Sequence, residues 1–276
     1  MLELVDALSD RLLRSFGARS LVIPTSAGSV HAYDATGPGE RTFVLLHGMG
    51  TTATSYTGIF LGLRPHARRV VLVDLPGHGR SVLGESFLSV AALGDGIREA
   101  LDGILWEEER FVLFGTSLGG AAALRYALDR PKRIAKLILV SPGGAPLSEE
   151  DFLALRRRFD VRTAEDARRF FSLLMHDPPL YFRLFEKGLV SQLGRPFIQR
   201  FLAEVSPDDF FKKEELASLR VPTLVIWGKR DRILPRSSLA FYRDALPEGT
   251  VFEEPDALGH SPHVEQPGFL MKRLLA

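Results

Sequence analysis

A chain of 276 residues can form one large α/β domain that carries an insertion and buries a substantial core. Apolar residues make up 45% and charged residues 25%, with a formal net charge of +1, which excludes a disordered or membrane-embedded chain and gives no excess charge to attract nucleic acid. The chain has 0 cysteines, so disulfides, thiolate metal sites and cysteine nucleophiles are also excluded.

The first predicted element is a helix over residues 2–16, where apolar residues recur at helical spacing among acidic ones. The helix either packs on its own domain or forms a peripheral membrane or dimer contact, and its acidic balance argues against anionic lipid. Because this segment lacks the features of a signal peptide and no apolar run approaches the ~20 residues of a membrane span, we expect a cytoplasmic protein without a transmembrane segment. The apolar residues are Val5, Leu8, Leu12 and Phe16, and the acidic ones are Glu3, Asp6 and Asp10.

Apolar β-type runs then alternate with helical patterns, which predicts a mostly parallel eight-stranded sheet flanked by helices. The first two strands are so close in sequence that we expect an antiparallel hairpin at one edge. Strands are expected at Ser20–Pro24, Val30–Tyr33, Thr42–Leu46, Val70–Asp74, Arg110–Phe114, Lys136–Ser141, Thr223–Gly228 and Thr250–Glu254. Helices are expected at Thr54–Leu63, Val90–Leu105, Leu118–Leu128, Ser237–Ala245 and Glu265–Leu275.

The alternation stops between about Gly144 and Glu215, a stretch with helical signals and no strand pattern. We interpret residues 144–216 as a helical cap inserted into an α/β core that comprises residues 1–143 and 217–276. Its many apolar residues, such as Phe170, Phe171 and Phe182, either line an apolar substrate pocket or are buried as one face of an amphipathic insertion.

The most informative motif is Gly-Thr-Ser-Leu-Gly at residues 115–119, which lies between an apolar strand and a helix of small residues. This arrangement is typical of a nucleophile elbow, in which a tight turn holds a serine at the carboxyl end of a strand. Glycines are needed there because the strand and helix backbones pass too close for side chains. Ser117 is therefore the candidate nucleophile.

The order of this and four other motifs resembles the α/β-hydrolase family, in its cap-bearing serine esterase and lipase branch, similar to monoacylglycerol lipases or carboxylesterases. The resemblance extends over nearly the whole chain from about Leu21 and implies the α/β-hydrolase fold with an inserted helical cap. The other motifs are Leu45–Gly50, Asp74–Ser81, Val225–Asp231 and Gly259–Pro267.

The resemblance implies a catalytic triad, because a serine hydroxyl needs a base, and the base needs an acid that fixes its tautomer. Asp231 follows an apolar strand and His260 lies in a turn before the last helix, so the chain order serine, aspartate, histidine is that of the fold. The rivals His263 and Asp256 are interpreted as structural and turn residues.

The tetrahedral intermediate would also need two oxyanion donors. One is expected to be the backbone N–H of Leu118, directly after the nucleophile. The other is the backbone N–H of Met49, in a loop that Gly48 and Gly50 allow to bend. We expect His47 to brace this loop.

Three functions remain open. The leading one is hydrolysis of an apolar carboxylic ester, with a short- to medium-chain acyl group or a monoacylglycerol, through an acyl-enzyme intermediate. The alternative is a carbon–carbon bond hydrolase or hydroxynitrile-lyase-like enzyme, from whose usual motifs Thr116 and residues 49–52 depart. A non-catalytic ligand-binding protein is the third. Neither a metal nor an organic cofactor is implied, and the expected partner is a small-molecule ester.

Overall fold

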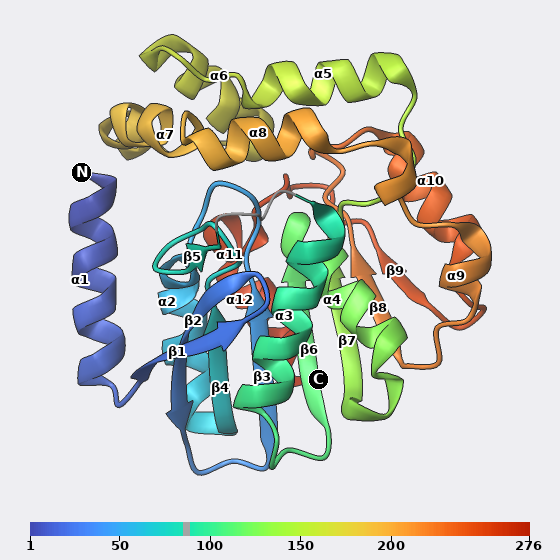
Figure 1. Cartoon of the computed structure of the whole chain (residues 1–276). Coiled ribbons are helices and arrows are strands. Elements are labelled where there is room, and N and C mark those ends of the chain that lie inside the picture. Colours follow the sequence, from blue (N-terminus) through green and yellow to red (C-terminus); the bar gives the residue numbers. More distant parts are fainter. Residues whose placement is uncertain (85–88) are drawn as a thin grey trace.

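The computed structural model describes residues 1–84 and 89–276, and it is built around one twisted sheet with helices on both faces (Figure 1). The nine-stranded sheet has the order β1-β2-β4-β3-β6-β7-β8-β9, and β5 pairs with β2 beside this path. From β4 to β9 all neighbours are parallel, so the predicted α/β-hydrolase fold with a mostly parallel sheet is confirmed. The strands are β1 (Arg19–Thr25), β2 (Gly28–Thr36), β3 (Arg41–Leu46), β4 (Ala67–Val73), β5 (Val82–Leu83), β6 (Phe111–Thr116), β7 (Ile134–Val140), β8 (Thr223–Ile226) and β9 (Val251–Glu253).

The predicted hairpin at the sheet edge is confirmed, with β1 antiparallel to β2 from the pair Arg19/Asp34 to the pair Thr25/Gly28. Its loop is shorter than expected, because both strands extend toward each other until only Ser26 and Ala27 remain between them. Gly28 has a φ of 119°, and a Cβ there would lie 2.3 Å from the carbonyl oxygen of Val82. This close approach lets β5 pair with β2. With two residues, β5 is too short to carry a sequence pattern, so the count of eight strands was one too low.

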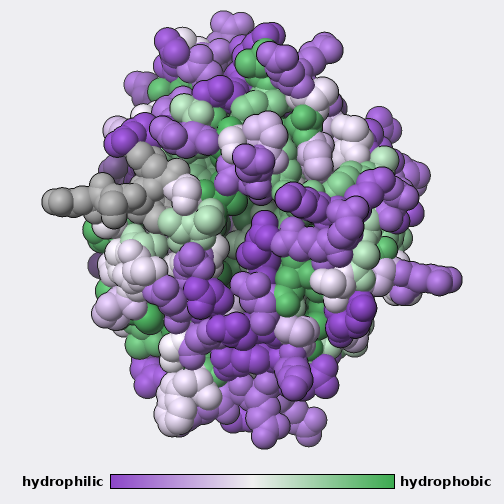
Figure 2. Space-filling model, turned by 45° about the vertical axis from the view of Figure 1, so that its right-hand side comes forward, coloured by the Kyte–Doolittle hydropathy of each residue, from purple (hydrophilic) through white to green (hydrophobic). Residues whose placement is uncertain are grey.

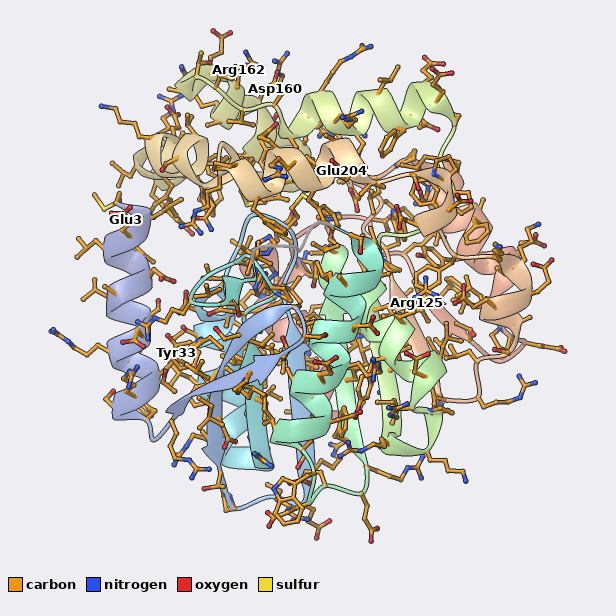
Figure 3. All side chains as sticks on the ribbon, viewed as in Figure 1. Glu3, Tyr33, Arg125, Asp160, Arg162 and Glu204 are labelled. Carbon is orange, nitrogen blue, oxygen red and sulfur yellow. The ribbon has the colours of Figure 1, made fainter. Side chains whose placement is uncertain are left out.

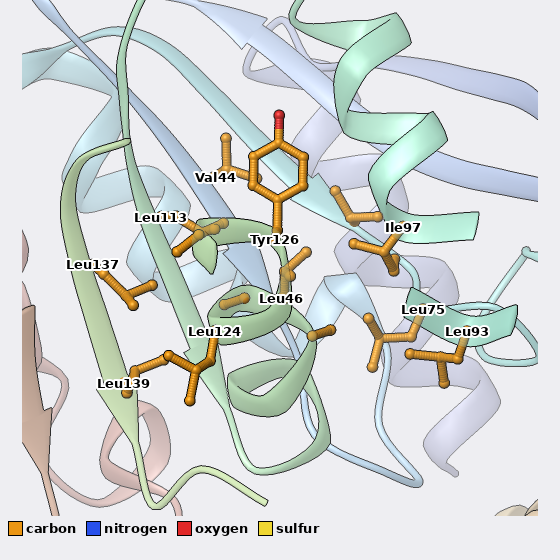
Figure 4. Packing of buried hydrophobic residues seen from close by; sticks show 14 of the residues in the cluster. Val44, Leu46, Leu75, Leu93, Ile97, Leu113, Leu124, Tyr126, Leu137 and Leu139 are labelled. Atoms are coloured by element: carbon orange, nitrogen blue, oxygen red, sulfur yellow. The ribbon is translucent and has the colours of Figure 1, made fainter. Parts of the chain in front are cut away.

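Helices cover both faces of the sheet, and α3 and α4 lie on the face toward the viewer in Figure 1. Side chains alternate between the faces, as a strand requires. For example, Val44 and Leu46 pack beneath α3 and α4, whereas Phe43 and Leu45 pack beneath α2 and α12 (Figure 4). The helices outside the insertion are α1 (Leu2–Ser15), α2 (Thr57–Leu63), α3 (Val90–Ile104), α4 (Leu118–Asp129), α10 (Arg236–Ala245), α11 (Pro262–Glu265) and α12 (Pro267–Leu275), with 3-10 turns η1 (Ala53–Tyr56), η2 (Arg64–His66) and η3 (Pro131–Arg133).

The last helix was predicted as one element and is two. Pro267 has no N–H to donate and disfavours helical geometry in the residue before it. Gln266 is accordingly non-helical, with φ −142° and ψ 66°, and it separates α11 from α12.

Between β7 and β8 the chain forms a succession of helices, of which α5, α6, α7 and α8 lie across the carboxyl ends of the strands at the top of Figure 1, while α9 lies beside α10 at the right. Thr163 and Asp166 form a reciprocal capping box at the start of α6. Most of the charged groups of this layer point outward, as Asp160, Arg162 and Glu204 do in Figure 3. The elements are α5 (Glu149–Phe159), α6 (Ala164–Leu174), η4 (Leu180–Phe185), α7 (Glu186–Leu193), α8 (Pro196–Glu204), η5 (Pro207–Asp209) and α9 (Lys213–Ala217).

The buried strand β6 gives a stability prediction. Leu113 is 0% exposed and packs between the sheet and α4, so Leu113→Ala should lower the free energy of unfolding in urea by about 2–5 kcal/mol. Leu153 in α5 is 41% exposed, and Leu153→Ala is the matched control, with an expected loss below about 1 kcal/mol. Equal losses in the two variants would contradict this description of the core.

Candidate active site

Ser117 occupies a strained turn between β6 and α4. Its backbone has φ 55° and ψ −117°, and Ser117 and Ser141 are the two non-glycine residues with positive φ among the residues that the structure describes. Such strain persists only where surrounding contacts impose it. A Cβ at Gly115 would lie 2.2 Å from the carbonyl oxygen of Gly119, and one at Gly119 would lie 2.3 Å from that of His47. The glycines of the motif are thus required by backbone contact.

Backbone hydrogen bonds hold this turn in place. The N–H of Ser117 donates to the carbonyl of Val140 at 3.0 Å, and its own carbonyl accepts from Ala121 at 3.0 Å and from Gly143 at 2.9 Å. The turn is therefore tied to its own helix and to the end of the neighbouring strand β7. Ser117 is partly exposed and faces the space beneath the helices that follow β7.

The structure brings His260 and Asp231 together. Nδ1 of His260 donates to Oδ2 of Asp231 at 2.7 Å, and Oδ1 of Asp231 accepts from the backbone N–H of Ile233 at 2.9 Å. Burial would raise the pKa of Asp231, but the adjacent His260 and these hydrogen bonds hold it below the ordinary value. Because Nδ1 carries the proton, Nε2 of a neutral His260 is left as a proton acceptor. His260 and Ser117 line the same cavity.

Glu265 anchors the loop that carries His260, and the sequence analysis did not single it out. Its carboxylate accepts from the backbone N–H groups of Gly259 at 3.1 Å, of Ser261 at 3.3 Å and of His176 at 2.7 Å. From the sequence, Glu265 is expected only as the first residue of the helix Glu265–Leu275. A carboxylate that accepts several backbone N–H groups can be recognised only once the turn before it is known.

His47 braces the loop that contains Met49, as expected. Its Nε2 accepts from the backbone N–H of Leu75 at 3.0 Å, so Nδ1 carries the proton and donates to the carbonyl of Gly48 at 2.8 Å. His47 is fully buried, and burial lowers its pKa, which keeps the ring neutral. The backbone N–H groups of Met49 and Leu118 have no protein acceptor among residues 1–84 and 89–276, and Met49 and Leu118 line a cavity together with Ser117.

Asp74 accepts most of the hydrogen bonds in the polar network next to the loop that contains Met49. One carboxylate oxygen accepts from the backbone N–H of Ala53 at 2.7 Å, and the other accepts from that of Arg80 at 3.1 Å and from Nδ1 of His31 at 2.8 Å. Burial opposes its ionisation, but His31, His47 and these donors lower the pKa of Asp74 overall. The carboxylate thus joins β2, through His31, to the backbone at Ala53 and at Arg80.

Two cavities meet at Ser117. The larger, of 290 Å³, also contacts His260; its lining combines phenylalanine and leucine side chains of α6, η4 and α7 with residues of α1 and of the segment 48–55. The smaller, of 110 Å³, lies on the side of Leu118 and Gly143 and is almost entirely apolar. Met49, Phe159 and Ile233 border both. On the face shown in Figure 2, hydrophobic residues gather around a central hollow within a largely hydrophilic surface.

Neither rival residue takes part in the pair. Asp256 is exposed and forms an ion pair with Lys229 at 2.7 Å, away from His260. His263 lies in α11 and packs against the Tyr56 ring, with ring centroids 4.9 Å apart. Across residues 1–84 and 89–276, no group of three or more His, Asp or Glu side chains is placed to hold a metal ion.

Comparison with known proteins places this arrangement in a family. The model of the alpha/beta hydrolase family matches residues 43–273, most of the chain. This chain belongs to the alpha/beta hydrolase family. The resemblance seen in the sequence is thus confirmed, and a hydrolase is the class of enzyme that the family supports.

A curated relative of this hydrolase is a 2-hydroxy-6-oxononadienedioate/2-hydroxy-6-oxononatrienedioate hydrolase from Paraburkholderia phymatum. The two sequences are 30% identical over 219 residues, and the alignment covers 74% of this chain and 75% of the relative's length. Two solved structures share the fold. Carboxylesterase CesB from Bacillus subtilis has a TM-score of 0.81 at 21% identity and covers 99% of this chain and 95% of its own. A 2-hydroxy-6-oxo-6-phenylhexa-2,4-dienoate hydrolase from Rhodococcus sp. strain RHA1 has a TM-score of 0.81 at 22% identity, with coverages of 94% and 97%.

The half-buried His263 of this hydrolase predicts acid sensitivity. Burial, with the nearby His260 and His47, lowers its pKa from 6.5 to about 4, so below pH 6.5 the unfolded chain binds a proton that the folded protein does not. This histidine alone should therefore make the free energy of unfolding fall by about 3 kcal/mol between pH 6.5 and pH 4. Denaturant titrations across this range measure the slope.

His263→Phe should show a shallower slope than the wild type, whatever its stability at neutral pH. The control is His66→Phe, at an exposed position, which should retain the wild-type slope. Equal slopes in all three proteins would mean that His263 is not held neutral by burial.

Proposed function

We propose that the chain is a serine hydrolase that cleaves carboxylic esters with apolar groups of short to medium length on both sides of the ester bond. The observation that carries the proposal is the position of Ser117 between two apolar cavities. The acyl group would occupy the 290 Å³ cavity and the alcohol part the 110 Å³ cavity. Residues 144–216 would act as the cap that roofs both.

In this proposal Ser117 attacks the ester carbonyl while Nε2 of His260 accepts its proton, and Asp231 holds the ring in the tautomer that allows this. The N–H groups of Met49 and Leu118, which lack protein acceptors in the described part of the chain, would bind the oxyanion. His260 then protonates the departing alcohol. Water activated by the same histidine hydrolyses the acyl-enzyme.

A carbon–carbon bond hydrolase is the second candidate, and it has the stronger support from sequence likeness. The relative at 30% identity bears a name of that class, whereas the esterase structure lies below 25% identity and shows only the fold. One feature of the site also favours this candidate. Arg195 lines the larger cavity and has no ion pair within residues 1–84 and 89–276, so it could bind a substrate carboxylate.

The smaller cavity favours the ester. A dioate, the substrate in the relative's name, carries carboxylates at both ends, so one would enter this cavity. Its described lining contains no lysine, arginine or histidine, and its one charged residue is Asp209. Placing a carboxylate there without a partner would cost several kcal/mol.

The two candidates are separated by parallel rate measurements. Wild-type protein should hydrolyse p-nitrophenyl esters with a rate maximum at short to medium acyl length, and Ser117→Ala should abolish this turnover. The same proteins are then given 2-hydroxy-6-oxo-6-phenylhexa-2,4-dienoate, whose dienol absorbance reports cleavage. Faster Ser117-dependent loss of the dienol than of any ester would replace the proposal with the second candidate. If neither substrate shows Ser117-dependent turnover, both enzyme candidates are wrong and a non-catalytic ligand-binding protein is the remaining interpretation.

The acid is tested by a matched pair of variants. Asp231→Asn should lower kcat on the order of 10⁴-fold, because the amide favours the wrong tautomer of His260. Asp256→Asn, at an exposed residue paired with Lys229, should leave kcat within about two-fold of the wild type. Similar kcat values for the two variants would mean that another group serves His260.

A further inference from the structure

In helix α1 the polar side faces the protein and the apolar side faces solvent, which is the reverse of an ordinary surface helix. Its inward face carries Asp6, Ser9 and Asp10, and Leu13 is its one fully buried residue. The apolar stripe that would normally pack on a domain faces solvent instead, with Leu4 56%, Leu8 54% and Phe16 47% exposed. We call the residues of this stripe the outer face of α1: Leu4, Val5, Leu8, Leu12 and Phe16.

The inward contacts of α1 explain this orientation. Asp10 accepts from Arg14 at 3.0 Å, from Arg80 at 2.7 Å and from the Tyr33 hydroxyl at 2.7 Å. Asp6 accepts from the hydroxyls of Thr52 and Thr54. The hydrogen bonds and charges of these partners lower the pKa of Asp10 to about 2 against the effect of burial. Two of the three carboxylates expected to repel anionic lipid, Asp6 and Asp10, thus point into the protein, whereas Glu3 is exposed.

A second exposed apolar group lies in η4, which contacts α7, and α7 in turn contacts α1. Leu2 packs against Gly188 at the start of α7, where a Cβ would lie 2.7 Å from the leucine. The preceding turn η4 exposes Leu180, Tyr181 and Leu184, at 78%, 55% and 60%. Both α1 and η4 contribute residues to the lining of that cavity, and Glu3 lies at the end of α1 nearest to α7 (Figure 3).

The charges of this region complement an anionic surface. In α1, η4 and α7, three cations and two carboxylates have no ion pair with another described residue: Arg11, Arg183 and Lys187, and Glu3 and the inward-facing Asp6, which accepts from the hydroxyls of Thr52 and Thr54. Asp10 is paired with Arg14 and Arg80, and Glu186 with Arg168. A symmetric dimer through this region would bring two sets of the three cations into one interface, whereas anionic headgroups would neutralise them.

We propose that the outer face of α1, together with η4, docks on the surface of a phospholipid bilayer that contains anionic lipid. The apolar side chains insert among the acyl chains and the three cations meet the headgroups, as in other interfacial amphipathic helices. None of the helices formed by residues 1–84 and 89–276 is long and apolar enough to cross a bilayer, so attachment through them is peripheral. Docking in this orientation brings α1 and η4, which both contribute to the lining of the larger cavity, to the lipid surface. It is a property separate from the proposed function, because it needs no turnover.

The test is co-sedimentation of the full chain with vesicles of phosphatidylcholine, alone or mixed with phosphatidylglycerol. Wild-type protein should sediment with the mixed vesicles and more weakly with phosphatidylcholine alone. Leu8→Glu/Leu12→Glu, at residues outside the cavity lining, should bind the mixed vesicles at least about ten-fold more weakly. Arg11→Gln/Arg183→Gln should reduce the preference for the anionic vesicles.

The matched control is Trp106→Glu, which removes an apolar side chain that is 75% exposed and lies between α3 and β6. It should bind like the wild type, and circular dichroism and thermal unfolding verify that every variant is folded. Wild-type protein that stays in solution with both vesicle types would overturn the proposal, as would unchanged binding by Leu8→Glu/Leu12→Glu. A wild-type dimer in light scattering that this double variant dissociates would assign the face to a second copy of the chain instead.

Discussion

The close approach of β6 and α4 at residues 115–119 is the constraint on which the site depends. Backbone atoms of Gly115 and Gly119 lie where any side chain would collide with a carbonyl oxygen, and Ser117 takes up the resulting strain at φ 55°. The compact turn lets the helix start directly after the serine, and the N–H of Leu118 beside it has no acceptor within residues 1–84 and 89–276. One local geometry thus exposes a hydroxyl and supplies a hydrogen-bond donor next to it.

Three carboxylates hold the other loops around this turn, and two of them, Asp74 and Asp231, are buried. Asp74 fastens the loop of Met49 to β2, Asp231 orients His260, and Glu265 gathers the backbone N–H groups on either side of His260. Each of the three carboxylates accepts hydrogen bonds from backbone N–H groups. These bonds fix the backbone conformation of loops that lack the regular hydrogen bonds of a strand or helix. The apolar cavities are bounded by these fixed loops on one side and by the helices after β7 on the other.

Much of this could be predicted from the sequence, because the elements concerned are read from local patterns. Alternating apolar runs located the strands, and the elbow, Asp231 and His260 follow from motifs of a few residues. Glu265 and the inverted α1 could not be found in this way. The apolar stripe of α1 suggests which side is buried, but Asp6 and Asp10 find partners in Thr52 and Arg80, which are remote in sequence. Those partners turn the polar side inward.

The end of α6 is attached by its backbone to the segments that carry Arg232, His260 and Glu265. The carbonyl of Leu174 accepts from the N–H of His260 at 2.7 Å, that of Leu173 accepts from Arg232 at 3.3 Å, and the N–H of His176 donates to Glu265. For protein engineering, this makes residues 173–176 part of the core rather than of the exchangeable helices. A chimaera that takes the helices between β7 and β8 from another hydrolase would need to keep this short stretch, since replacing it changes the backbone that contacts His260.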